Sequence, residues 1–165
     1  RNIVNCTAWK ENYKMKTIAT LLLLLVTFTN SCKKDDDINN QNQNPNIPNA
    51  VFDTQNLIDT GLPQYNNLLI PSQHVIVTGG NIGINGIVVY YTGSSYLAWE
   101  LSDPNHQISN CSTLTVNGIV ASCSCDDDNS YFIANGLPES GTTGQYTLVP
   151  YQVEVNGNVI RVYNN

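Results

Sequence analysis

From residue 51 onward, short runs of apolar and β-branched residues alternate with clusters of Gly, Asn, Asp and Ser. No window there carries apolar residues at the i, i+3, i+4, i+7 spacing of an amphipathic helix, so we expect little helix. Short runs bounded by turn residues are typical of β-strands. The pattern predicts strands at residues 51–53, 68–70, 74–78, 87–92, 96–101, 114–116, 119–121, 131–133, 146–155 and 158–163.

Turn residues separate these predicted strands. Asn-Gly pairs begin at Asn85, Asn117, Asn135 and Asn156. Asn-Gly between two strands predicts a tight hairpin whose central residues need a positive φ. Short strands at this spacing are typical of a small antiparallel sandwich or a partly open barrel. The sequence therefore predicts an all-β fold, an antiparallel β-sandwich built from residues 51–165.

The first 50 residues follow a different pattern. Met15 and a Lys are followed by an apolar run that contains five consecutive Leu and ends at Cys32. A basic start and an apolar run of about a dozen residues are typical of a signal peptide and too short for a spanning helix. We interpret residues 1–14 as translated upstream sequence and residues 15–31 as the signal peptide. Residues 32–50 are rich in Asn and predict a flexible tether.

The end of the signal peptide resembles a bacterial lipobox, because Ser31 precedes Cys32. The resemblance implies that Cys32 becomes the lipidated first residue of the mature protein. The partner would then be the membrane, and the location would be the cell envelope, at the outer membrane. The Lys and Asp residues at 33–37 resemble the surface-export signal of Bacteroidota lipoproteins. The alternative is a solvated run of charges at the start of the tether.

The charge of the chain limits its partners. The formal net charge of the whole sequence is -6, and from Cys32 onward 3 basic residues stand against 12 acidic ones, a net of -9. Such a balance argues against nucleic acid as a partner. Aromatic residues alternate along the predicted strands, and a row of them left exposed would bind a glycan or a protein.

Two polar loops stand on either side of the strands predicted at residues 114–116 and 119–121. Asp103 and His106 lie in the first loop, and Cys123 and Asp126 lie in the second. If the two loops converge, these four side chains supply enough ligands for one zinc or iron ion.

The order of segments in this region resembles the Rieske iron–sulfur domain family. Residues 83–90 and 96–100 resemble the hairpin that leads into the first cluster loop, and residues 131–141 resemble the aromatic strand and the Pro-containing loop that covers the cluster. Residues 148–162 resemble the closing hairpin. The resemblance implies two stacked antiparallel sheets with a smaller, loop-bearing subdomain.

Rieske domains bind a [2Fe–2S] cluster through a Cys-x-His loop and a Cys-x-x-His loop. In this chain Asp103 stands at the first Cys position, and His106 lies one residue later than the pattern requires. Cys123 keeps the second Cys position, but Asp126 replaces the second His. Because sulfide-bridged iron favours thiolate over carboxylate, we expect a Rieske-like domain that has lost its cluster and acts as a binding or structural module. The alternative is a [2Fe–2S] electron-transfer protein; neither is an independent enzyme.

Five cysteines are present. Cys6 lies in the upstream segment and Cys32 is expected to carry lipid, which leaves three in the domain. Many Rieske proteins carry an extra Cys in each loop, and the two form a disulfide. The resemblance implies that pairing for Cys111 and Cys125, with Cys111 bonded to Cys123 as the alternative. In the first case Cys123 is a free thiol, either buried and inert or available to metal.

Overall fold

The computed structural model describes residues 44–165. The expected upstream segment, the signal peptide and the lipidation site at Cys32 lie outside this range. Within residues 44–165, no helix has the length and apolar character needed to cross a membrane.

The folded region starts earlier than we expected. Residues 44–50 were assigned to the tether, yet Ile47 and Ala50 are buried, and Ala50 belongs to a hydrophobic core. The side-chain amides of Asn44 and Asn46 both donate to the carbonyl oxygen of Pro104, at 2.7 and 3.0 Å. Two apolar side chains and specific amide hydrogen bonds hold this Asn-rich segment against the domain.

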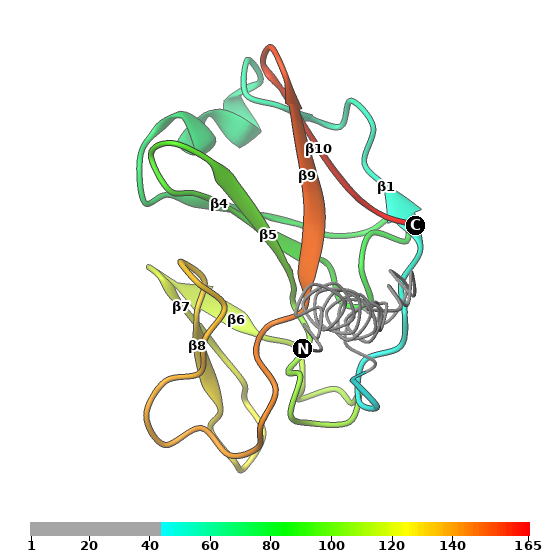
Figure 1. Ribbon diagram of the computed structural model, residues 1–165, viewed down its shortest axis with the longest axis vertical. Helices are drawn as coiled ribbons and strands as arrows, with labels where there is room; N and C mark the ends of the chain where they lie inside the picture. The colour runs from blue at the N-terminus through cyan, green and yellow to red at the C-terminus, as the bar shows by residue number, and fades with distance from the viewer. Residues whose placement is uncertain (1–43) are drawn as a thin grey trace, which may run out of the picture. The chain divides into compact units, whose positions relative to one another are not determined.

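The larger sheet has seven strands, all paired antiparallel. They are β1 (Phe52–Asp53), β2 (Ile58–Asp59), β3 (His74–Val77), β4 (Ile87–Tyr91), β5 (Tyr96–Glu100), β9 (Pro150–Asn156) and β10 (Val159–Asn164). The order is β1-β10-β9-β5-β4-β3, and β2 also pairs with β10. The first two residues of β9 pair with β5 and the others pair with β10, so the sheet curls at β9 (Figure 1).

The smaller sheet carries the two Cys-bearing loops. It consists of β6 (Thr115–Asn117), β7 (Val120–Ser122) and β8 (Ser130–Phe132), paired antiparallel in that order (Figure 1). The first loop enters it from β5, and the second loop joins β7 to β8. The predicted fold class, an all-β antiparallel fold with a smaller loop-bearing sheet, is confirmed.

The hairpin turns differ from our prediction by one residue. Asn117 pairs with Val120, so Asn117 is the last strand residue and the two-residue loop consists of Gly118 and Ile119. Gly118 has a φ of 60°, whereas Asn117 is not among the residues with positive φ. Glycine at the first loop position is the pattern of a type II′ turn, in which only that residue needs positive φ. The β9–β10 hairpin shows the same shift.

The strand predicted at residues 68–70 is wrong. Most of it lies in the 3₁₀-helix η1 (Pro63–Leu69), which begins with a Pro whose fixed φ suits the first helical turn. Leu68 is fully buried, but Leu69 and Ile70 are 59% and 55% exposed. A run of three apolar residues is too short for its period to distinguish a strand from a helix.

Two hydrophobic cores lie on opposite faces of β4. Ile87 and Val89 point into a core lined by the rest of the larger sheet and η1, whereas Val88 and Tyr90 pack against the smaller sheet. This burial on both faces explains why β4 is a continuous apolar run and does not alternate. The second core contains Trp99, whose ring nitrogen donates to the carbonyl oxygen of Ile133 at 2.7 Å. The smaller sheet is therefore docked firmly on β4 and β5.

Candidate functional site

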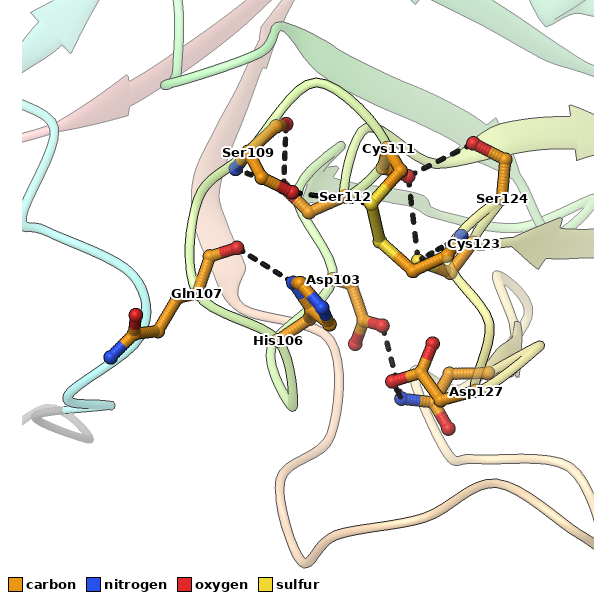
Figure 2. The surroundings of a disulfide bond; sticks show 11 residues. Asp103, His106, Gln107, Ser109, Cys111, Ser112, Cys123, Ser124 and Asp127 are labelled. Carbon is orange, nitrogen blue, oxygen red and sulfur yellow. Dashed lines mark hydrogen bonds between the residues drawn. A yellow bond between two sulfur atoms is a disulfide. The ribbon is translucent and has the colours of Figure 1, made fainter.

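The two Cys-bearing loops converge. Cys111 of the first loop and Cys125 of the second form a disulfide with an S–S distance of 2.10 Å and a Cα–Cα distance of 5.0 Å (Figure 2). This is the pairing that the family resemblance implied. Cys123 is the free cysteine of the described region, so the alternative pairing is not formed.

Cys123 is a buried thiol. Its sulfur lies 3.5 Å from the carbonyl oxygen of Cys111 and accepts a hydrogen bond from the backbone N–H of Cys125 at 3.4 Å. Burial, together with the neighbouring Asp103 carboxylate and against the lowering effect of the Cys125 N–H, raises the pKa of the Cys123 thiol to about 11. The thiol is therefore protonated at neutral pH and is a poor nucleophile.

Asp103 is fully buried at the base of the first loop. Its Oδ1 accepts hydrogen bonds from the Tyr131 hydroxyl at 2.5 Å and from the backbone N–H of Asn105 at 2.9 Å. Its Oδ2 accepts one from Nδ2 of Asn129 at 3.0 Å. Burial, with the adjacent Asp103, raises the pKa of Tyr131. Both carboxylate oxygens are therefore occupied by donors from the first loop, the second loop and β8.

The same hydrogen bonds continue into the segment between β8 and β9. The Asn105 side chain donates to the carbonyl oxygen of Tyr146 at 2.7 Å and accepts from its N–H at 2.9 Å. Oδ1 of Asn129 accepts from the backbone and hydroxyl of Thr143 at 2.8 and 3.1 Å. Gly144 has a φ of 97°, and a Cβ there would collide with Asn105. We call Asp103, Asn105, Asn129 and Tyr131 the Asp103 network.

His106 and Asp126 lie outside the Asp103 network. His106 is half-buried, and its Nδ1 lies 2.7 Å from the carbonyl oxygen of Gln107 (Figure 2). Asp126 is exposed. Residues 44–165 contain two groups of three potential metal ligands, and within each group the ligand atoms lie within 4.8 Å of one another. The first group is His106, Cys111 and Cys125, and the second is Cys123, Cys125 and Asp127. Asp103 and Asp126 belong to neither group.

The donor set does not fit a Rieske cluster. That cluster needs two thiolates and two imidazoles. Outside the disulfide, the two loops offer one thiol, Cys123, and one imidazole, His106. The other His of the chain, His74, lies in β3. Asp103, which the sequence resemblance assigns to the position of the first Cys, is already hydrogen-bonded on both oxygens.

Sequence reasoning missed the partners of Asp103. The sequence analysis gave no role to Asn105 or Asn129, and it placed Tyr131 in a strand with no role for its hydroxyl. A signal was available for Tyr131, because a buried phenol needs a hydrogen-bond partner and Asp103 stood in the adjoining loop. No comparable signal marked the two Asn residues, because Asn is common in the loops of this chain.

A second buried carboxylate, Glu100, was also missed. It ends an otherwise apolar strand, and a charged residue in such a position is a signal of a buried polar contact. Glu100 is fully buried and accepts hydrogen bonds from the backbone of Ile84 and Asn85 at 2.8 and 3.0 Å. It also accepts from the hydroxyls of Ser102 and Tyr151 at 2.7 and 2.6 Å. Glu100 therefore fixes the turn before β4 to the start of the first loop.

Comparison with known proteins gives a distant likeness to solved structures. No protein-family model matches the chain, and no curated protein matches it. A solved structure with a similar chain is titled as the complex of reduced oxygenase and oxidized ferredoxin in carbazole 1,9a-dioxygenase. The sequences are 26% identical, the TM-score is 0.39, and the match covers 56% of this chain and 82% of that one. The function must therefore be inferred from the residues of the site.

Proposed function

We propose that this protein is a lipid-anchored cell-envelope protein whose Rieske-like domain holds no iron–sulfur cluster and serves as a binding or structural module. The observation that carries the proposal is the state of Asp103. Its side chain accepts three hydrogen bonds from within the protein. The Rieske resemblance assigns this residue to the position of the first thiolate ligand.

Recruiting Asp103 to iron would disrupt the Asp103 network. The Tyr131 hydroxyl is buried with its ring, and losing its acceptor would cost roughly 1–3 kcal/mol. A carboxylate is also a hard oxygen ligand, whereas iron in a sulfide cluster favours thiolate. Both effects oppose a cluster at this position.

The loops have another means of staying together. The disulfide of Cys111 and Cys125 joins them covalently, and Asn129 connects the second loop to Asp103 at the base of the first. Asn105 connects the first loop to the segment before β9. The arrangement presents a rigid loop surface, which suits a binding or structural role.

The alternative is a [2Fe–2S] electron-transfer protein that serves an oxidoreductase. Cys123 favours it, because this residue keeps the family's Cys position and lies in the second loop opposite His106. The shortage of further thiolate and imidazole ligands argues against it.

The partner is proposed to be the membrane, through lipid on Cys32, together with a protein or a glycan. Tyr91 and Tyr96 are half-buried and stack with their ring centroids 4.6 Å apart. An aromatic pair of this kind is a suitable contact for a sugar ring or a protein side chain. The acidic balance supports the exclusion of nucleic acid.

The test is to express the full chain in a bacterial host and to fractionate the cells after feeding a labelled fatty acid. We expect label in the membrane-bound protein and none in a Cys32→Ser variant. The purified protein should be colourless and free of stoichiometric iron and sulfide. A coloured protein with stoichiometric iron and sulfide contradicts the cluster-free domain, and unlabelled, soluble protein contradicts the lipid anchor.

A further inference from the structure

Two cysteines and one histidine lie close to the sulfur atom of Cys125. The Cys125 sulfur lies in both groups of potential ligands, so a ring nitrogen of His106 and the sulfurs of Cys111 and Cys123 all lie within 4.8 Å of it. Thiolates and imidazole are the ligands that Zn²⁺ prefers in tetrahedral protein sites. In the oxidised protein two of the four donors are unavailable, because Cys111 and Cys125 are bonded to each other.

Reduction of the disulfide would release these two donors at a suitable distance. With Zn–S bonds of about 2.3 Å, two thiolates of a tetrahedral site stand about 3.8 Å apart. The sulfurs of Cys111 and Cys125, now 2.10 Å apart, need to separate by side-chain rotation only, since their Cα atoms are already 5.0 Å apart. Cys123 and Cys125 already lie within 4.8 Å.

The imidazole of His106 is already prepared as a ligand. Its Nδ1 lies 2.7 Å from the carbonyl oxygen of Gln107. A carbonyl only accepts, so Nδ1 is the donor in this contact, and in the neutral ring Nε2 is then the nitrogen that can bind a metal. Histidines that bind metal usually donate their other N–H in this way, which fixes the tautomer and the ring orientation.

A carboxylate oxygen beside the cysteines has no hydrogen-bond partner within the described region. This oxygen is Oδ1 of Asp127, which is buried, while Oδ2 of the same residue accepts from Asn129 at 2.8 Å. An oxygen of Asp127 lies within 4.8 Å of the sulfurs of Cys123 and Cys125. An unpaired buried carboxylate oxygen is unfavourable, and a nearby divalent cation would relieve it.

The geometry points to a second, redox-dependent site in which Cys111, Cys123, Cys125 and His106 bind one Zn²⁺ ion after the disulfide is reduced. The site is independent of the proposed function, because it concerns the reduced protein and a different metal.

The chemistry needs a dithiol reductant. One of its thiolates attacks the sulfur of Cys111, which is the more exposed half of the disulfide, and the S–S bond breaks with Cys125 leaving as a thiolate. The second thiol of the reductant then displaces Cys111, so that the reductant becomes a disulfide and the protein holds three thiols. Zn²⁺ binding displaces the three thiol protons, and the metal then joins the two loops in place of the S–S bond.

The test uses the full chain with Cys6→Ser and Cys32→Ser, so that the three thiols of the domain are the ones measured. The protein is reduced anaerobically with a phosphine and titrated with Co²⁺ and then Zn²⁺. We expect one Co²⁺ per chain, with thiolate-to-cobalt charge-transfer absorption that an equivalent of Zn²⁺ abolishes. The oxidised protein should show no such absorption.

Matched variants separate the site from nonspecific binding. Cys123→Ser and His106→Ala should each weaken binding by roughly 100-fold or more, because each removes a ligand. Asp126→Asn, in the same loop but exposed, should leave binding unchanged. Circular dichroism follows the strands throughout. Three results contradict the proposal: reduced protein that stays folded and binds no Co²⁺, reduced protein that unfolds and is not restored by Zn²⁺, and binding that survives both ligand variants.

Discussion

Replacing Asp103 with Ala tests whether the Asp103 network holds the loops. The fully buried Tyr131 hydroxyl would lose its acceptor, whereas Nδ2 of Asn129 would keep its bond to Asp127. Each buried donor without a partner costs about 1–3 kcal/mol, and the cavity left by the carboxylate adds to it. We expect Asp103→Ala to lower the free energy of unfolding by roughly 3 kcal/mol.

The assay is denaturant unfolding at pH 7 with the disulfide intact, followed by tryptophan fluorescence. Tyr131→Phe removes the hydroxyl alone. A double-mutant cycle of Asp103→Ala and Tyr131→Phe should give a coupling energy between the two side chains of about 1–3 kcal/mol. Asp126→Ala is the matched control, because Asp126 is exposed, and should change stability by no more than ~0.5 kcal/mol. If Asp103→Ala costs no more than this control, the network does not hold the loops.

Three further predictions concern the same region. With a pKa of about 11, Cys123 in the folded protein should react with iodoacetamide at pH 8 about 90-fold more slowly than a thiol of pKa about 9, and its rate should rise about tenfold per pH unit up to that pKa. Gly144→Ala should destabilise the fold by roughly 2–3 kcal/mol, measured by thermal unfolding, because the new Cβ collides with Asn105 and the φ is positive. Reducing the disulfide, which joins two cysteines 14 positions apart, should lower the free energy of unfolding by about 3 kcal/mol in a denaturant titration without metal.

Each of these has a result that would refute it. Rapid alkylation of the native protein at pH 8 would show that the Cys123 thiol is ionised or exposed. The comparison for Gly144→Ala is Gly157→Ala, where φ is also positive but nothing lies within 4 Å of the new Cβ, so only the backbone cost of about 1 kcal/mol applies. Equal effects at the two glycines would remove the steric argument. Unchanged stability after reduction would mean that other contacts alone hold the loops.

The strands could largely be predicted from the sequence because their pattern is local. The paired runs of β4 and β5 appear where the apolar and turn residues placed them. The closing hairpin of β9 and β10 does too, except that β9 begins at Pro150 and not at residue 146. The wrong predictions, one strand and the turn positions, have local causes too. Pro63 starts a 3₁₀-helix over residues that a three-residue apolar run had suggested as a strand. In the hairpin turns, glycine alone takes positive φ, which shifts Asn117 into the strand.

The site was less predictable because it depends on contacts between distant segments. The disulfide followed from the family resemblance and not from the spacing of the three cysteines. The substitution at Asp103 was visible in the sequence, but its consequence was not. The hydrogen bonds to the Asp103 carboxylate come from Tyr131 and Asn129, which lie 28 and 26 positions further along the chain. Single-sequence patterns carry no information about such contacts.

The most direct test of the cluster-free domain is anaerobic reconstitution. The purified chain, with its disulfide intact, is incubated with iron and sulfide, desalted, reduced, and examined by electron paramagnetic resonance and by iron analysis. Because Asp103 is committed to the hydrogen bonds of its network and Cys111 and Cys125 to each other, the account predicts no stoichiometric iron and no cluster signal. A reduced protein with stoichiometric iron, sulfide and the signal of a [2Fe–2S] centre would contradict it.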